Sequence, residues 1–474
     1  MEKINIGWAE VDITPEKPVS LRGQFHKRIS ERVESPLFAT VMAVECGGEQ
    51  MILCTCDLVA VSTDLVKMAK EKINGRAKGL DPSKIIIGAT HTHTGPYADK
   101  NTNNTTLHTA NEFLEPEKRY TEEKDPPGTM NPEECLEFIS ARISDAVAEA
   151  WNNKKTSYYS RQFGRAVTGH CRRAVYSDGS VLMYGGTNDK NFDCLEGSSD
   201  SGVELLYTFD AQKELSGIIV NVACPSQVVE NECYISSDYW GDARRCLREV
   251  YGEKLFVLGQ CSAAGDQSPR DLIRQGKDSE THMSGAEGKA EIGRRIAAAA
   301  TEKYEAAKNN MTDTAKLIHE TETIDFPLRT VSESEYQKAA EAFDAYVKAS
   351  KKERFEIGDM VNLHEISGIM KRFEEQKTTS FFSSEIHCAR LGDVAFATNP
   401  FELFLDFGFR IKARSRAAQT FLIQLACDCG SYLPTKKAQK GGHYSAYVVS
   451  GITGYEGGDL LVERTVEKIN SFWK

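Results

Sequence analysis

The chain has 474 residues, of which 40% are hydrophobic and 27% charged, a balance typical of a globular protein with a sizeable core rather than a disordered chain. Its formal net charge of -11 at pH 7 argues against nucleic acid as a partner, because phosphate binding requires clustered Lys and Arg side chains.

The N-terminus carries no export signal. Met1-Glu2-Lys3-Ile4-Asn5 lacks an apolar stretch followed by a small-residue cleavage site. No apolar run in the sequence approaches the roughly 20 residues that cross a bilayer. The 13 cysteines, an odd number, indicate reduced thiols rather than a disulfide framework. We therefore expect a cytoplasmic protein without stable membrane insertion, either a monomer or an oligomer.

The first half of the chain has the pattern of a strand–helix–strand unit. Strands are expected near residues 40–45 and at 51–57, and the second is apolar almost throughout, as in a sheet covered on both faces. A helix follows with Ser62 or Thr63 as its N-cap. A strand at residues 84–89 then delivers a polar segment at its carboxyl end, where α/β sheets commonly place their sites.

The rest of the chain alternates strands and helices, apart from two segments that do not follow this pattern. Residues 99–132, including 101–106, form a long polar excursion that we expect near the site. A charged helical hairpin is inserted at about 332–376. The other expected elements are helices at 138–151, 242–250 and 285–307 and strands at 205–209, 216–223, 255–260, 385–391, 394–398 and 419–425. The sequence thus predicts one large α/β domain over residues 1–474, with a mixed β-sheet flanked by helices.

Two histidines follow the strand at 84–89. His91 and His93 are two residues apart, so in an extended segment both project to the same side, and neutral imidazoles bind divalent metals readily. An isolated pair would be read as a polar strand end, but the sharp turn of Thr94-Gly95-Pro96 favours a site. The metallo-β-lactamase pattern would require Asp and His soon afterwards, and amidohydrolase barrels usually carry His-x-His on their first strand. Neither pattern fits this chain.

The segment around these histidines resembles a known signature. Residues 88–96, Gly-Ala-Thr-His-Thr-His-Thr-Gly-Pro, are similar to the G-T-H-T-H-S-G-P segment of neutral (alkaline, non-lysosomal) ceramidases. Further segments resemble motifs of that family in the family's order: 171–174 (Cys-Arg-Arg-Ala), 264–269 (Ala-Gly-Asp-Gln-Ser-Pro), 399–402 (Asn-Pro-Phe-Glu), 430–435 (Gly-Ser-Tyr-Leu-Pro-Thr) and 454–458 (Gly-Tyr-Glu-Gly-Gly). The resemblance covers nearly the whole chain and implies a ceramidase-like α/β fold.

The resemblance implies a zinc ion (Zn²⁺) bound by His91, Glu402 and Tyr432. The family's second zinc histidine lies in a Phe-Pro-x-His-Ser-Thr segment, and the corresponding stretch here has Cys224 in the histidine's place. A thiolate is itself a strong zinc ligand, so we predict Cys224 as the fourth ligand. The alternative is that Cys224 is a buried thiol and His93 completes the metal site.

The resemblance also implies the catalytic residues. Ser268 would lie beside the metal as a nucleophile or a proton-relaying hydroxyl. Arg173 and Tyr455 would surround the scissile carbonyl, and His93 would polarise the substrate oxygen. Together these groups suit amide hydrolysis, in which a metal and hydrogen-bond donors stabilise a developing oxyanion.

The resulting functional prediction is a zinc-dependent amidohydrolase that cleaves a linear N-acyl amide. Exported family members usually carry a C-terminal immunoglobulin-like domain, which we do not expect here, so a small soluble amide is as suitable a substrate as a lipid-like one. Two alternatives remain open. The change at Cys224 would suit a non-catalytic metal- or ligand-binding protein on the same scaffold, and a zinc esterase could use the same centre.

Overall fold

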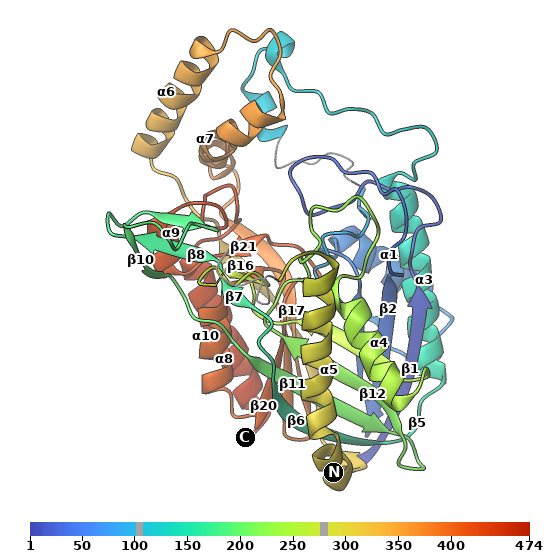
Figure 1. Ribbon diagram of the computed structural model, residues 1–474. Coiled ribbons are helices and arrows are strands. Elements are labelled where there is room, and N and C mark those ends of the chain that lie inside the picture. Colours follow the sequence, from blue (N-terminus) through green and yellow to red (C-terminus); the bar gives the residue numbers. More distant parts are fainter. Residues whose placement is uncertain (101–107, 275–282) are drawn as a thin grey trace.

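The computed structural model describes residues 1–100, 108–274 and 283–474 (Figure 1). Three larger β-sheets form its framework, and each combines antiparallel neighbours with one parallel pair of strands. The predicted residues 101–106 lie outside the described part of the chain. The expected α/β class, with mixed sheets flanked by helices, is confirmed, although the strands are divided among several sheets rather than collected in one.

The first sheet has the order β15-β1-β2-β3-β4, with β5 beside β1. Its strands are β1 (Glu2–Asp12), β2 (Phe38–Cys46), β3 (Glu49–Cys56), β4 (Ile85–Ala89), β5 (Lys155–Thr156) and β15 (Thr314–Ala315). Helices α1 (Thr63–Ile73) and α3 (Pro132–Asn152) pack on one face of this sheet. Ser62 caps α1, since its side chain accepts a hydrogen bond from the backbone N–H of Leu65.

The second and third sheets repeat this plan. The second has the order β13-β12-β11-β6, with β13 (Phe256–Cys261), β12 (Leu215–Val222), β11 (Gly202–Phe209) and β6 (Tyr158–Arg165), and is covered by α4 (Tyr239–Tyr251) and α5 (Gly285–Asn309). The third has the order β16-β17-β18-β20, with β16 (Leu317–Pro327), β17 (Phe381–Leu391), β18 (Val394–Thr398) and β20 (Gln419–Ile423), and is covered by α8 (Leu405–Arg414) and α10 (Tyr455–Ser471). Figure 1 shows these helices on the outside of the sheets.

A core shared by all three sheets holds the framework together. Side chains alternate along each strand, so Leu205 faces the covering helices while its neighbour Leu206 faces the shared core. Trp8 from β1 reaches across this core, stacks on Phe256 of β13 and donates its indole N–H to Thr208 Oγ1 at 3.0 Å. The sheets therefore pack face to face around an apolar centre, and each has a helical outer layer.

Two short strand pairs and one small three-stranded sheet lie outside these three larger sheets. They are β7 (His170–Cys171) with β14 (Gln267–Ser268), β19 (Glu402–Leu403) with β21 (Tyr432–Leu433), and the small sheet of β8 (Arg173–Tyr176), β9 (Val181–Met183) and β10 (Phe192–Leu195). A short helix α9 (Lys436–Gly441) follows β21.

The inserted hairpin forms a separate helical layer. Helices α6 (Glu333–Ala349) and α7 (Ile357–Glu375) match the expected insertion and lie apart from the sheets in Figure 1. They enclose a small core of their own together with Ala110 and Leu114 from the polar excursion. In the described ranges, no helix is both long and apolar enough to span a bilayer.

Candidate metal and catalytic site

Segments that follow strand ends in all three sheets meet at one end of the framework. After β4, the carbonyl of Thr90 accepts a hydrogen bond at 2.8 Å from Ser226 Oγ, which follows β12. After β20, the backbone N–H of Gln424 donates to the carbonyl of Cys261, the last residue of β13, at 3.1 Å. The sheets therefore present the carboxyl ends of their parallel strands to a common region, where α/β proteins commonly bind ligands.

A cavity of about 420 Å³ lies in this region. Four of the residues predicted from the sequence line it, namely His91, His93, Glu402 and Tyr432. The other polar or aromatic lining residues are Arg22, Gln24, Phe25, Tyr97, Arg172, Tyr184, Gln227, Glu230, Asn231, Arg270, His364, Ser431, Tyr444 and Ser450. The structure thus brings together half of the predicted site residues, from segments far apart in the chain.

His91 is held in a fixed and unusual conformation. Its backbone φ is +68°, in the left-handed region that residues other than glycine seldom adopt. Its ring Nδ1 lies 2.6 Å from the carbonyl of Val59. A carbonyl only accepts hydrogen bonds, so Nδ1 carries a proton and Nε2 is the nitrogen that faces the cavity. Nε2 lies 3.3 Å from Glu402 Oε2 and 3.3 Å from His93 Nε2.

Glu402 and Tyr432 stand side by side because β19 and β21 pair in parallel, with these two residues in register. The phenol oxygen of Tyr432 accepts a hydrogen bond at 3.2 Å from Arg172, which also donates to the carbonyl of Gly265 at 2.9 Å. Burial alone would raise the pKa of Glu402, but His91 and Arg172 outweigh it and hold that pKa below its usual value. Glu402 is therefore a carboxylate that faces a histidine and a phenol.

These atoms suit a bound cation. Two lone-pair atoms facing each other in a buried place repel unless a proton or a metal lies between them. Neighbouring ligands on a tetrahedral zinc with bonds of about 2.0–2.1 Å lie about 3.3 Å apart, and His91 Nε2 has that distance from Glu402 Oε2. Within the described residues, no group of three or more His, Cys, Asp or Glu side chains has metal-binding geometry. A third ligand would therefore come from the phenol of Tyr432.

His93 is the second neighbour of His91 Nε2, besides Glu402. Its ring is perpendicular to that of His91, and its Nδ1 lies 3.7 Å from Glu230 Oε2. Arg270 pairs with the other oxygen of Glu230 at 2.8 Å. Burial, reinforced by His91, lowers the pKa of His93 well below its usual value, so its ring is neutral. His93 thus lies between the predicted metal ligands and a buried Glu–Arg pair.

Arg173 does not reach the cavity, although the sequence placed it at the substrate carbonyl. Its guanidinium is fully buried and pairs with Glu196 at 2.6 Å. It also donates to the carbonyls of Gly442 at 2.7 Å and Tyr444 at 2.9 Å. The arginine that faces the cavity is its neighbour Arg172. The physical reason is local, because β7 ends at Cys171 and β8 begins at Arg173, so Arg172 lies in the break between the two strands while Arg173 belongs to β8.

Ser268 lies one side chain away from the cavity. It is fully buried, and Tyr184, which lines the cavity, donates its hydroxyl hydrogen to Ser268 Oγ at 3.2 Å. Gln227 in turn donates from Nε2 to the Tyr184 oxygen at 2.6 Å. In this arrangement Tyr184 separates Ser268 from the cavity, and the two hydroxyls form a continuous hydrogen-bonded path.

Cys224 lies outside the cavity lining, although the sequence predicted it as a ligand. Its thiol donates to the carbonyl of Thr168 at 3.1 Å and packs in the core between the second sheet and its helices. Burial, followed by Cys261, raises the pKa of Cys224 well above its usual value. The side chain is therefore a neutral buried thiol, which was the alternative interpretation of the sequence.

Tyr455 also points elsewhere. As the first residue of α10 it lines a different pocket, and Lys436 lies 5.1 Å from the centre of its ring. The cavity-lining tyrosine that contacts Tyr432 is Tyr444, whose ring meets that of Tyr432 edge to face at 5.6 Å. Residues 443–445 include two non-glycine residues with positive φ, a conformation that sequence patterns do not reveal.

The sequence interpretation missed Arg172, Tyr184, Gln227, Glu230, Arg270 and Tyr444 as lining residues. Two of them had a signal close at hand, since Arg172 adjoins the predicted Arg173 and Gln227 ends the stretch that contains Cys224. Tyr184, Glu230 and Arg270 carry no motif, and only the fold brings them to the cavity.

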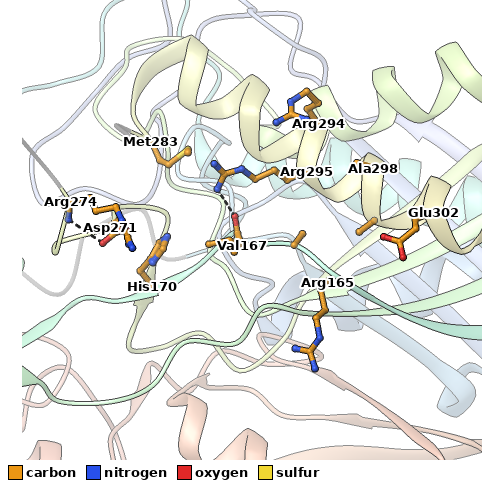
Figure 2. Close-up of a pocket in the computed structure, with 12 residues that line it drawn as sticks. Arg165, Val167, His170, Asp271, Arg274, Met283, Arg294, Arg295, Ala298 and Glu302 are labelled. Atoms are coloured by element: carbon orange, nitrogen blue, oxygen red, sulfur yellow. Dashed lines mark hydrogen bonds and ion pairs between the residues drawn. The ribbon is translucent and has the colours of Figure 1, made fainter. Parts of the chain in front are cut away.

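A second pocket, of about 540 Å³, lies beside α5 (Figure 2). None of the predicted site residues line it. Its arginines are already engaged, because Arg295 donates to the carbonyl of Val167 at 2.9 Å and Arg274 pairs with Asp271 at 2.7 Å. This pocket holds no group of residues comparable to the one around His91, so the candidate site is the cavity described above.

Comparison with known proteins supports the fold. No family model and no curated protein sequence matches this chain. Among solved structures, it is similar to the neutral ceramidase from Pseudomonas aeruginosa, with a TM-score of 0.70 and 15% sequence identity over 100% of this chain and 75% of that one. A structure described as ceramidase complexed with C2 gives a TM-score of 0.69 with the same identity and coverage. The chain therefore has a ceramidase-like fold.

Proposed function

We propose that this protein is a zinc-dependent amidohydrolase that cleaves an N-acyl amide bond. The observation that carries the proposal is the meeting of His91 Nε2 with Glu402 Oε2 at 3.3 Å, beside the Tyr432–Arg172 pair, within a cavity of a ceramidase-like fold. The two solved structures described above are ceramidases, whose substrate contains an amide, and this supports the same reaction class here.

His91, Glu402 and Tyr432 would hold the zinc. Three protein ligands leave one coordination position open, which is the pattern of catalytic rather than structural zinc sites. Bound there, zinc would polarise the substrate carbonyl and activate water. We leave Cys224 out of the proposed ligand set because its thiol does not line the cavity and donates to the carbonyl of Thr168.

The surrounding side chains can stabilise charge and move a proton. Arg172 carries a permanent positive charge next to Tyr432, where it can stabilise negative charge that develops on the carbonyl oxygen. Tyr184 faces the cavity and is hydrogen-bonded to Ser268 Oγ, so the two hydroxyls can relay a proton, with Ser268 returning to Tyr184 the proton that Tyr184 gives to the leaving amine. We therefore assign Ser268 to proton relay rather than to nucleophilic attack, since Tyr184 lies between Ser268 and the cavity.

The cavity suits a small polar amide. Its volume of about 420 Å³ lies at the low end of the range for small-molecule pockets. Arg22, Arg172 and Arg270 place three guanidinium groups in its lining. Phe25 and His364, the latter from the inserted helix α7, complete the wall on the side of the insertion. This lining favours a substrate with polar or anionic groups over one with two long acyl chains.

A metal analysis followed by a substrate screen tests the proposal. Purified protein supplied with zinc is expected to hold it stoichiometrically and to release amine from short N-acyl amines or N-acyl amino acids. Ser268→Ala should retain zinc and thermal stability while kcat falls about 10²- to 10⁴-fold, the range for a lost proton-transfer group. Matching esters are assayed in parallel.

Each other outcome contradicts a stated part of the proposal. Stoichiometric zinc without turnover of any amide or ester would indicate a metal-binding protein on this scaffold. Turnover of esters with no amide hydrolysis would indicate a zinc esterase. Full activity in Ser268→Ala would remove that hydroxyl from the proton path while leaving the metal site standing.

A further inference from the structure

A second group of chemically active side chains surrounds Cys427, in the loop between β20 and β21. Cys427 is largely buried and borders a pocket of about 650 Å³. The pocket lies between α1, which contributes Thr63, Lys67 and Lys70, and residues 383–385 of β17. It shares no lining residue with the candidate amidohydrolase cavity. The chemistry of this second group is therefore independent of the proposed amide hydrolysis.

Two histidines form a directed hydrogen-bond chain that ends at Cys427. His319 Nδ1 lies 3.1 Å from the carbonyl of Gln50, so this nitrogen carries the proton and His319 Nε2 accepts. His387 Nδ1 lies 3.0 Å from that Nε2 and is therefore the donor. The remaining nitrogen of His387, Nε2, lies 3.5 Å from Cys427 Sγ and 3.2 Å from Glu385 Oε1.

This chain gives His387 the role of a base for the thiol. With Nδ1 already protonated, Nε2 of neutral His387 has a lone pair and can take the proton of Cys427. The resulting imidazolium lies between the thiolate and the Glu385 carboxylate, both of which stabilise it. A nucleophile, a base in contact with it and a third group that orients the base are the elements of an activated cysteine.

The electrostatics agree with this geometry. Burial alone would raise the pKa of Cys427, but His387 outweighs it and lowers that pKa below the usual value. Burial would likewise lower the pKa of His387, but Cys427 and Glu385 raise it to about 9. Burial raises the pKa of Cys388 to about 12, as expected for an inert core thiol. Cys427 therefore differs from an inert core thiol because a base, His387, contacts its sulfur.

We propose that Cys427 is a nucleophilic thiolate that is modified by low-molecular-weight disulfides entering the pocket between α1 and β17. The thiolate attacks one sulfur of the disulfide, a new S–S bond forms at Cys427, and the other half leaves as a thiolate that can take the proton from His387. Exchange conserves electrons, so no further oxidant is required. The lining holds Lys67 and Lys70 beside Glu71, Glu385 and Asp428, so it offers partners to both the carboxylates and the ammonium groups of a peptide-like disulfide.

A pH-resolved modification experiment on the intact protein tests this site. Protein is incubated with oxidised glutathione from about pH 6 to about pH 9, a range that spans ordinary thiol ionisation, and the adducts are assigned by peptide mass spectrometry. Cys194 is exposed and serves as an internal reference. At about pH 6, Cys427 is expected to react at least about tenfold faster than Cys194, because His387 is in place to take its proton.

The variant His387→Gln removes the base while keeping a polar side chain, and Cys427→Ser confirms the assignment of the adduct. His387→Gln is expected to abolish the advantage of Cys427 at low pH. If circular dichroism shows that this variant does not fold, the pH dependence of adduct formation in the wild-type protein tests the proposal on its own. No adduct on Cys427 at any pH, or a rate at about pH 6 no greater than that of Cys194, would overturn the proposal.

Discussion

His91→Asn is expected to abolish stoichiometric zinc binding and to lower kcat/KM for amide hydrolysis by about 10³-fold or more, equivalent to roughly 4 kcal/mol of transition-state stabilisation. Asparagine tolerates the left-handed backbone at this position, where φ is +68°, so the substitution removes the ligand with little added strain. Metal content and kcat/KM are measured on the same preparations. Thermal unfolding is compared between metal-free proteins, because bound metal itself raises the Tm.

A matched control exists in the same chain. His443 also has a left-handed backbone, with φ at +67°, but its ring accepts a hydrogen bond from the backbone N–H of Met183 and does not line the cavity. His443→Asn is expected to keep zinc and to leave kcat/KM within about twofold of the wild type. Equal losses in both variants would point to a backbone effect, and an active, zinc-loaded His91→Asn would refute the assigned ligand.

Substitution of the two adjacent arginines is expected to separate catalysis from stability. Arg172→Met should lower kcat/KM by about 10²- to 10³-fold, the usual cost of losing a group that stabilises an oxyanion. Arg173→Met leaves Glu196 buried and unpaired, so the free energy of unfolding should fall by about 3–5 kcal/mol. The folded fraction of Arg173→Met should still turn over substrate at close to the wild-type rate.

Denaturant unfolding gives the stability of both variants, and kcat/KM is normalised to the folded fraction at a temperature below both transitions. The reverse result would restore the assignment made from the sequence. In that case Arg173→Met would be folded but inactive, while Arg172→Met would hydrolyse the amide at a normal rate.

The contrast between these arginines shows what a motif can and cannot predict. Resemblance of residues 171–174 to a family segment pointed to a stretch that contains the cavity-lining Arg172. It could not fix the register, because side chains alternate between faces along a strand and a shift of one residue exchanges them. Here β7 ends at Cys171 and β8 begins at Arg173, and this break decides which guanidinium enters the cavity.

Cys224 and Tyr455 illustrate a second limit. Both were assigned to the site from their position within a resembling segment. In the structure, the thiol of Cys224 is directed to the carbonyl of Thr168, and Tyr455 is held at the start of α10. Glu402 and Tyr432 lie in the short paired strands β19 and β21, which set their directions. His91 follows β4 by two residues, as Cys224 follows β12, so distance from a strand end did not decide which side chain reaches the cavity.

The fold was predictable where hydrophobic patterns were strong. The expected strands at 394–398 and 419–425 appear as β18 and β20, and the inserted hairpin appears as α6 and α7. The outer strand β16 was missed because alternate residues face solvent with charges, and α10 because its first turn, Tyr-Glu-Gly-Gly, contains two glycines. Alternation shows which faces are buried but not which strands share a sheet, so the division into several sheets was not foreseen.

Diffraction from crystals grown with zinc, recorded on both sides of the zinc absorption edge, tests the proposed metal site most directly. We expect an anomalous peak in the cavity about 2.0–2.2 Å from His91 Nε2, from a carboxylate oxygen of Glu402 and from the phenol oxygen of Tyr432. Zinc bound elsewhere on the protein, with no peak between these three side chains, would contradict the proposal.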